Sequence, residues 1–134
     1  MGKWFRQEGG SCCFPVAIMN ACRYKRKKIP RLCHLVRLSK TKNGGAIFTE
    51  DVANWAGLDM KETHDYKKVL KFGGILSIMH PIFNLHAVFC YKKDKEYYLV
   101  NSWLGATLIR VGLEEFKKYI WNTKSAYHWH FRRS

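Results

Sequence analysis

One stretch of the chain, LHAVFCYKKDKEYYLVN over residues 85–101, decides its fold. It contains two apolar and aromatic runs of strand length, 86–91 and 97–100, and the polar run 92–95 between them is typical of a tight turn. Neighbouring runs of this kind pair as an antiparallel hairpin. The stretch therefore predicts two adjacent strands, the first beginning near a histidine and the second ending at an asparagine.

The segments before this hairpin are predicted to be mainly helical. A proline at the first position and a basic run at the end predict a helix over 15–27. Two shorter helices are predicted over 32–38 and 50–55, and Thr49 and Gly57 suit the beginning and the end of the second.

Strands dominate the rest of the chain. We expect strands over 75–79 and 107–111 and an amphipathic helix over 113–120. Residues 126–131 alternate aromatic residues with histidines, which predicts a half-buried strand. Helices come first and antiparallel strands follow, so the predicted class is α+β, with N-terminal helices packed on a C-terminal antiparallel sheet. No linker or repeat interrupts the 134 residues, and we expect one domain over 1–134.

The charge of the chain is strongly basic, with 24 Lys+Arg against 10 Asp+Glu and a net charge of +14. Such a charge attracts acidic partners, which include an acidic protein or peptide, nucleic acid and an anionic surface. Arg132-Arg133 beside Trp129 and Phe131 form a combination that can hold a nucleic-acid backbone and stack on bases. An acidic partner is therefore expected, with nucleic acid among the candidates.

The five cysteines indicate a reducing environment, because an odd number cannot all pair within one chain. The sequence shows neither a signal peptide nor an apolar run of about 20 residues, and we expect a cytoplasmic protein without a transmembrane segment. Cys22, Cys33 and Cys90 are expected to be buried thiols without a chemical role. No Cys/His spacing is typical of a zinc site, so we expect neither metal nor cofactor.

The remaining two cysteines stand side by side in Gly10-Ser11-Cys12-Cys13-Phe14-Pro15-Val16. Adjacent cysteines do not easily meet disulfide geometry, and metal ligands are usually spaced. A thiol at the mouth of a helix is instead stabilised as the thiolate, which is the nucleophilic form. One of these two cysteines is therefore a candidate nucleophile.

The groups that a thiol nucleophile needs are also present in the sequence. It needs a base, and the base needs a third group to orient it. The hairpin places His86 beside Asn101, whose side chain can hold one imidazole nitrogen while the other faces sulfur. Gln7 can donate an amide hydrogen to a developing oxyanion, together with the backbone N–H of the cysteine.

These residues resemble the motifs of a known family. Gln7 and Cys13, then His86-Ala87-Val88, then Asn101-Ser102-Trp103-x-Gly105 resemble the papain-like cysteine peptidases, in the order found there. The size is similar to the compact branch that removes double-glycine leaders from bacteriocins. The resemblance covers about residues 7–131, nearly the whole chain.

The resemblance implies a minimal papain-like core and a cysteine peptidase that acts on a protein or peptide without a cofactor. It implies Cys13 as nucleophile, His86 as base, Asn101 as its orienting partner and Gln7 as oxyanion donor. His86 follows Cys13 by 73 residues and Asn101 follows it by 88, whereas in papain both lie about 130–150 residues beyond the nucleophile. This difference excludes the two-lobed enzyme and leaves the compact core.

Two alternatives stay open at this point. Gly10-Ser11-Cys12 resembles the run that precedes the nucleophile in papain, whereas the six-residue spacing from Gln7 favours Cys13. The same groups also serve deamidation or acyl transfer, and a catalytically silent papain-like protein could use its basic surface to bind an acidic protein or nucleic acid.

Overall fold

The computed structural model describes residues 4–5, 13–39, 50–80, 84–101, 107–111 and 127–133. The helices are α1 (Cys13–Tyr24), α2 (Leu32–Ser39), α3 (Glu50–Trp55) and α4 (Tyr66–Phe72). The strands are β1 (Met60–Thr63), β2 (Gly74–His80), β3 (Asn84–Lys93), β4 (Glu96–Asn101), β5 (Thr107–Val111) and β6 (His128–Phe131). These elements confirm the α+β class. No helix within the described ranges is long and apolar enough to cross a membrane.

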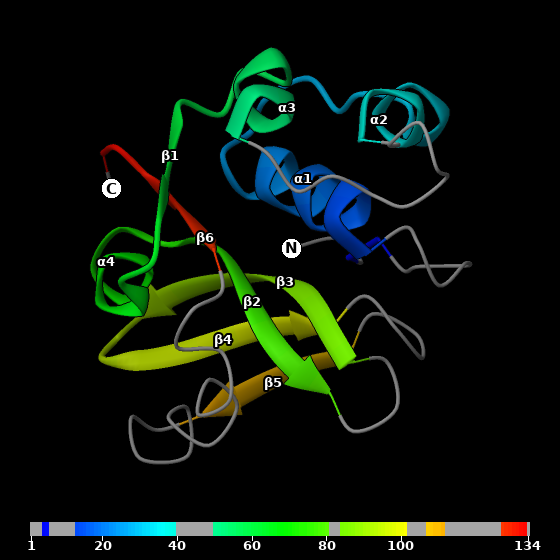
Figure 1. The fold of residues 1–134 in the computed structure, drawn as a ribbon. Coiled ribbons are helices and arrows are strands. Elements are labelled where there is room, and N and C mark those ends of the chain that lie inside the picture. Colours follow the sequence, from blue (N-terminus) through cyan, green and yellow to red (C-terminus); the bar gives the residue numbers. More distant parts are fainter. Residues whose placement is uncertain are drawn as a thin grey trace.

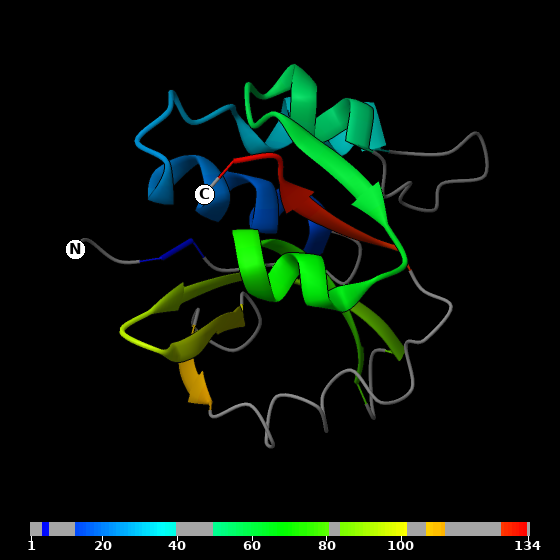
Figure 2. The same cartoon turned by 90° about the vertical axis from the view of Figure 1, so that its left-hand side faces the viewer.

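The strands form one antiparallel sheet in the order β1-β6-β2-β3-β4-β5, and the helices α1, α2 and α3 form a layer beside it (Figures 1 and 2). The predicted hairpin is confirmed as β3 and β4, both longer than expected. Its turn is formed by Asp94 and Lys95, with φ of 53° and 69°. Two consecutive residues with positive φ match the right-handed twist of the paired strands, which explains the tight turn.

The core lies on both faces of β3. Ala87, Phe89 and Tyr91 are buried together with apolar residues of α1, whereas Val88 and Cys90 are buried with Val69 of α4. Alternate residues of a strand point to opposite faces, so helices cover both sides of this strand. This double cover explains why residues 87–91 are apolar or aromatic at every position rather than at every second one.

Helix α1 ends three residues earlier than the basic run predicts. Arg26 has a φ of 56°, its N–H donates to the carbonyl of Arg23 at 3.2 Å, and the N–H of Lys27 donates to the carbonyl of Cys22 at 2.8 Å. This is a Schellman ending with an arginine where glycine is usual. Because the sequence carries no glycine there, the pattern alone did not reveal the end of the helix.

Two elements were absent from the sequence-based prediction. The edge strand β1 and the short helix α4 lie between α3 and β2, so helices do not all precede strands. Asp65 caps α4 by accepting a hydrogen bond from the N–H of Lys67 at 3.0 Å. Both elements are short, and a four-residue strand gives almost no periodic signal.

The strand over 126–131 was predicted to be half-buried, and this is wrong. All four residues of β6 are buried: His128, Trp129, His130 and Phe131. Phe14 packs on one face of β6, where its ring lies 4.9 Å from that of Trp129, and Phe72 of α4 packs against His130. Trp129 and Phe131 are core residues. The expectation that they stack on nucleic-acid bases is therefore wrong.

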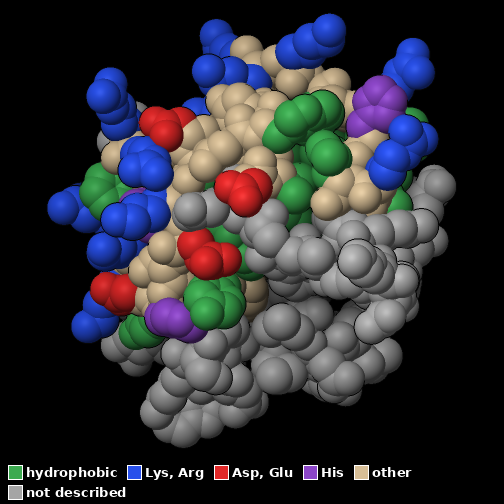
Figure 3. Space-filling view, turned by 45° about the horizontal axis from the view of Figure 1, so that its top comes forward, with side chains coloured by type: hydrophobic (Ala, Val, Ile, Leu, Met, Phe, Trp, Pro, Cys, Tyr) green, Lys and Arg blue, Asp and Glu red, His purple; other side chains and the backbone are tan. Residues whose placement is uncertain are grey.

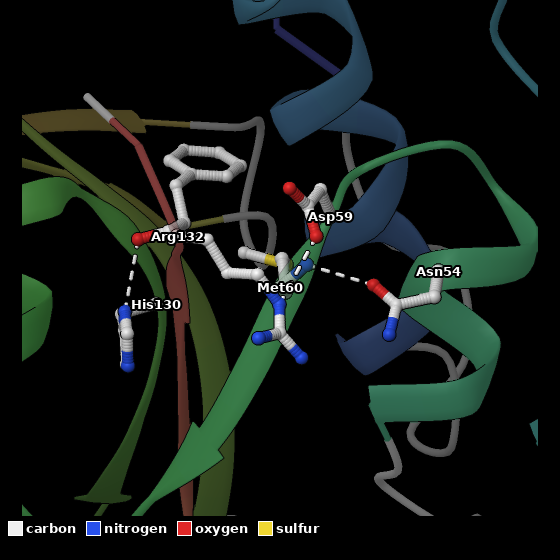
Figure 4. A network of polar contacts seen from close by, with 6 residues as sticks. Asn54, Asp59, Met60, His130 and Arg132 are labelled. Atoms are coloured by element: carbon white, nitrogen blue, oxygen red, sulfur yellow. Dashed lines mark hydrogen bonds and ion pairs between the residues drawn. The ribbon is translucent and has the colours of Figure 1, made fainter.

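A polar network fastens α3, β1 and β6 together (Figure 4). The Oδ1 of Asn54 accepts the N–H of Met60 at 2.7 Å. The carboxylate of Asp59 pairs with the Nε of Arg132 at 3.0 Å, and the Asp59 carbonyl accepts the N–H of Arg132 at 3.1 Å.

The predicted helix over 113–120 lies outside the described residues.

Candidate active site

Helix α1 begins at Cys13, two residues before the predicted start at residue 15, so this cysteine is the first residue of the helix. The helix is anchored from its second residue onward, because Phe14, Ala17 and Ile18 are buried in the core. The free backbone N–H groups of a first helical turn favour an anion beside them. The Cys13 backbone therefore has the position that stabilises a thiolate. Cys12 and the side chain of Cys13 lie outside the described residues.

His86 and Asn101 lie on the two neighbouring strands that the hairpin predicted. His86 pairs with Ile78 of β2, and Val100, the residue before Asn101, pairs with Phe89. Continuing this register places Asn101 opposite the residue two positions after His86. The two backbones are therefore close to one another in the sheet, and the structure describes neither side chain.

The beginning of α1 lies at the end of the sheet where these two residues are found. At its other end, the Tyr24 ring lies 5.3 Å from Phe89 and 4.8 Å from Tyr91. From Tyr24 the helix extends back ~16 Å at 1.5 Å per residue. Figures 1 and 2 show that it runs toward the side of the molecule where β3 begins and β4 ends. The backbone of Cys13 thus approaches the end of the sheet at which β3 begins and β4 ends, where His86 and Asn101 are located.

Asn20 binds the backbone of Phe5, a role that the sequence pattern did not predict. Asn20 is fully buried, and its Oδ1 accepts the N–H of Phe5 at 2.7 Å while its Nδ2 donates to the Phe5 carbonyl at 3.2 Å. Trp4 packs on Phe89 with ring centroids 5.8 Å apart. A single polar residue in the apolar run Ala17–Cys22 was the available signal. Gln7 itself lies outside the described residues.

The other thiols differ in exposure, and this corrects one expectation. Cys22 and Cys90 are buried, whereas Cys33 is exposed on α2. Burial raises the pKa of the Cys22 thiol to about 11, and the Lys27 ammonium lowers it only in part. Burial also raises the pKa of the Cys90 thiol well above its ordinary value. Neither buried thiol forms appreciable thiolate at neutral pH.

The described residues hold no group of three His, Cys, Asp or Glu side chains placed to bind a metal ion. The described backbone brings three positions to one end of the sheet: Cys13 at the start of α1, His86 near the start of β3 and Asn101 at the end of β4. A thiol, an imidazole and an amide are the side-chain types that a nucleophile, its base and the partner that orients the base require.

Comparison with known proteins identifies this architecture. No family model matches the sequence, and no curated protein matches it significantly. Among solved structures, the chain is similar to the peptidase domain of Streptococcus ComA, a bifunctional ABC transporter involved in a quorum-sensing pathway. The TM-score is 0.68 at 15% identity, over 98% of each chain. The chain has the papain-like fold of a peptidase domain.

A second solved structure has the same fold. It is a double-glycine-motif protease from an AMS/PCAT transporter, in complex with the leader peptide, with a TM-score of 0.55 at 19% identity. The alignment covers 99% of this chain and 95% of that one. The papain-like fold and the likeness to the compact double-glycine branch, both expected from four short motifs, are thereby confirmed.

Proposed function

We propose that this protein is a papain-like cysteine peptidase in which Cys13, His86, Asn101 and Gln7 form the active site. One observation carries the proposal: α1 begins at Cys13 beside the edge of the sheet where β3 carries His86 and β4 ends at Asn101. That arrangement occurs in a fold shared with peptidase domains.

In the proposed reaction the thiolate of Cys13 attacks the carbonyl carbon of the scissile bond, and the carbonyl oxygen becomes an oxyanion. The imidazolium of His86 then gives its proton to the leaving amine, and a thioester remains. Water, deprotonated by His86, hydrolyses the thioester, releases the acid and restores the thiolate–imidazolium pair. Asn101 holds the imidazole in the orientation that serves both steps.

The oxyanion donors are the backbone N–H of Cys13 and the side-chain amide of Gln7. The Asn20 clamp supports the role of Gln7, because it fixes Phe5 two residues earlier. Two residues of a chain span at most ~7 Å. A donor whose position is fixed before the substrate binds contributes more to catalysis than a free one.

The substrate is proposed to be a peptide whose cleavage site follows two small residues. One protein of the same fold is described as a double-glycine-motif protease bound to a leader peptide. Glycines let an extended peptide pass close to a helix start without steric conflict. The net charge of +14 favours substrates that carry acidic residues.

A thiol-labelling experiment tests the nucleophile. Cys33 is exposed and would add background labelling, so the experiment uses the Cys33→Ser chain. We expect a peptidyl vinyl sulfone to label one thiol at neutral pH, Cys13→Ala to abolish labelling, and Cys12→Ala to keep most of it. Cleavage of a peptide with an internal Gly-Gly should follow the same pattern. Loss of labelling in Cys12→Ala alone, or slow and equal labelling of all thiols, would contradict the proposal.

A further inference from the structure

The loop between α1 and α2 and its neighbours form a basic surface that the proposed peptidase site does not use. Figure 3 shows Lys and Arg side chains gathered over the helical side of the molecule, with hydrophobic side chains exposed among them. We call this surface the basic face and define it by two hollows and the residues that line them.

The first hollow has a volume of about 230 Å³, and its charged residues are Lys25, Lys27, Arg133 and Asp59. Asp59 is paired with Arg132 at the surface, so this carboxylate already has a cationic partner (Figure 4). The Lys25 ammonium lies 4.4 Å from the centre of the Phe131 ring and 3.4 Å from the Arg133 carbonyl oxygen. This position keeps a cation at the wall of the hollow.

The second hollow has a volume of about 370 Å³ and adjoins the first. Lys27 and Lys28 are consecutive, as are Ala56 and Gly57, and in each pair one residue lines each hollow. The second hollow is also lined by Arg31, His34 and Trp55, and no carboxylate of the described residues lines it. A continuous run of cations therefore crosses both hollows.

Trp55 distinguishes this surface from an ordinary solvated basic patch. Its side chain is 55% exposed at the end of α3, and it lines the second hollow. Groups that bind single-stranded nucleic acid combine cations along the backbone path with an aromatic ring on which an unpaired base stacks. An acidic peptide matches the cations but offers no base to stack on the indole.

We infer that the basic face binds single-stranded nucleic acid, with its phosphates along Lys25, Lys27, Lys28 and Arg31 and a base stacked on Trp55. The binding depends little on sequence, because backbone charge and stacking carry it. Duplexes bind more weakly, since their bases are already stacked on each other.

Fluorescence anisotropy with labelled 20-nucleotide oligothymidylate and oligouridylate tests the inference. The affinity should fall with salt, with a slope of log K against log salt of roughly −0.7 for each phosphate contacted. Lys27→Glu/Lys28→Glu should weaken binding by roughly tenfold or more and reduce that slope. The matched control is Lys67→Glu/Lys68→Glu on α4, which changes the net charge equally at another exposed lysine pair and should change the affinity by less than about threefold.

Tryptophan fluorescence tests the stacking. Trp55→Ala should weaken binding at least roughly fivefold, and oligothymidylate should quench the emission of the wild type but not that of Trp55→Phe. Equal losses in the two lysine pairs, quenching that persists in Trp55→Phe, or polyglutamate that competes as well as the oligonucleotide would each overturn the inference. None of these measurements involves Cys13, so their failure would leave the peptidase proposal standing.

Discussion

The side-chain amide of Asn20 binds the backbone of Phe5 through two hydrogen bonds, from the Phe5 N–H at 2.7 Å and to the Phe5 carbonyl at 3.2 Å. A side-chain amide here does what a neighbouring β-strand would do for a backbone. It joins the N-terminal segment to α1, whose first residue is Cys13.

Asn20→Leu removes both hydrogen bonds while it keeps the number of side-chain heavy atoms, and it should lower the free energy of unfolding by about 2–3 kcal/mol. The reason is that the Phe5 N–H and carbonyl lose their partners, and Trp4 loses part of its packing on Phe89. Urea unfolding measures the change. Tryptophan emission should also shift to longer wavelength, and this shift should be absent in a Trp4→Phe background. An unchanged midpoint and slope would show that the clamp contributes nothing.

Gly74 should tolerate no side chain, whereas Gly57 should tolerate one at a modest cost. Gly74 has a φ of 151°, and an added Cβ would overlap the Trp129 carbonyl oxygen and lie 2.8 Å from the His130 Cα. Gly57 has a φ of 86°, but nothing lies within 4 Å of an added Cβ. Gly74→Ala should therefore cost about 3 kcal/mol or more, because the pairing of β2 with β6 must shift.

Gly57→Ala is the matched control, with an expected cost of about 1–2 kcal/mol from the left-handed backbone alone. Thermal and urea unfolding of the two variants measure both costs. Equal destabilisation by the two substitutions would contradict the steric argument.

The hairpin and the helix at Cys13 could be predicted because each carries a local signal. The turn around Asp94 separates two runs of strand length, and a proline near the beginning of α1 marks its first turn. Those signals sufficed for the fold and for the backbone positions of His86 and Asn101, which the register then placed on adjacent strands.

The features that could not be predicted depend on contacts between distant segments. His128 and His130 looked like solvent-facing positions of an alternating strand, and they are buried because α4 covers that face. The role of Asn20 depends on Phe5, 15 residues earlier. The basic face is assembled from three separate parts of the sequence, so the charge composition indicated a basic surface but not its position. For the same reason the sequence analysis named Trp129, and not Trp55, as the residue that stacks on a base.

The proposed triad makes a graded prediction for activity. His86→Ala should lower kcat roughly 10²- to 10⁴-fold, because the reaction loses its proton donor and acceptor. Asn101→Ala should cost less, and Asn101→Asp should recover part of the loss, since a carboxylate still accepts a hydrogen bond from the imidazole. Cleavage kinetics with a Gly-Gly peptide measure these effects. A larger loss in Asn101→Ala than in His86→Ala would contradict the assigned roles.

The protein should lose stability in mild acid because of His128. Its Nδ1 accepts a hydrogen bond from the Ser77 N–H at 3.0 Å, which requires a neutral ring. Burial lowers the pKa of His128 from 6.5 to about 4; the nearby His64 adds to this lowering and Asp65 opposes it. The pKa of His128 is lower in the folded state than in the unfolded state. The contribution of neutral His128 to the free energy of unfolding is therefore complete above about pH 6.5 and is lost as the pH falls toward 4. The loss amounts to about 3 kcal/mol at most. Urea unfolding between pH 7.5 and 4 measures it, with exposed His34→Gln as the control. The amide oxygen of His128→Gln can still accept a hydrogen bond. At pH 7.5 this variant should be less stable than the wild type, and its stability should fall less steeply with decreasing pH. An identical pH dependence in the wild type and in His128→Gln would refute the role of His128.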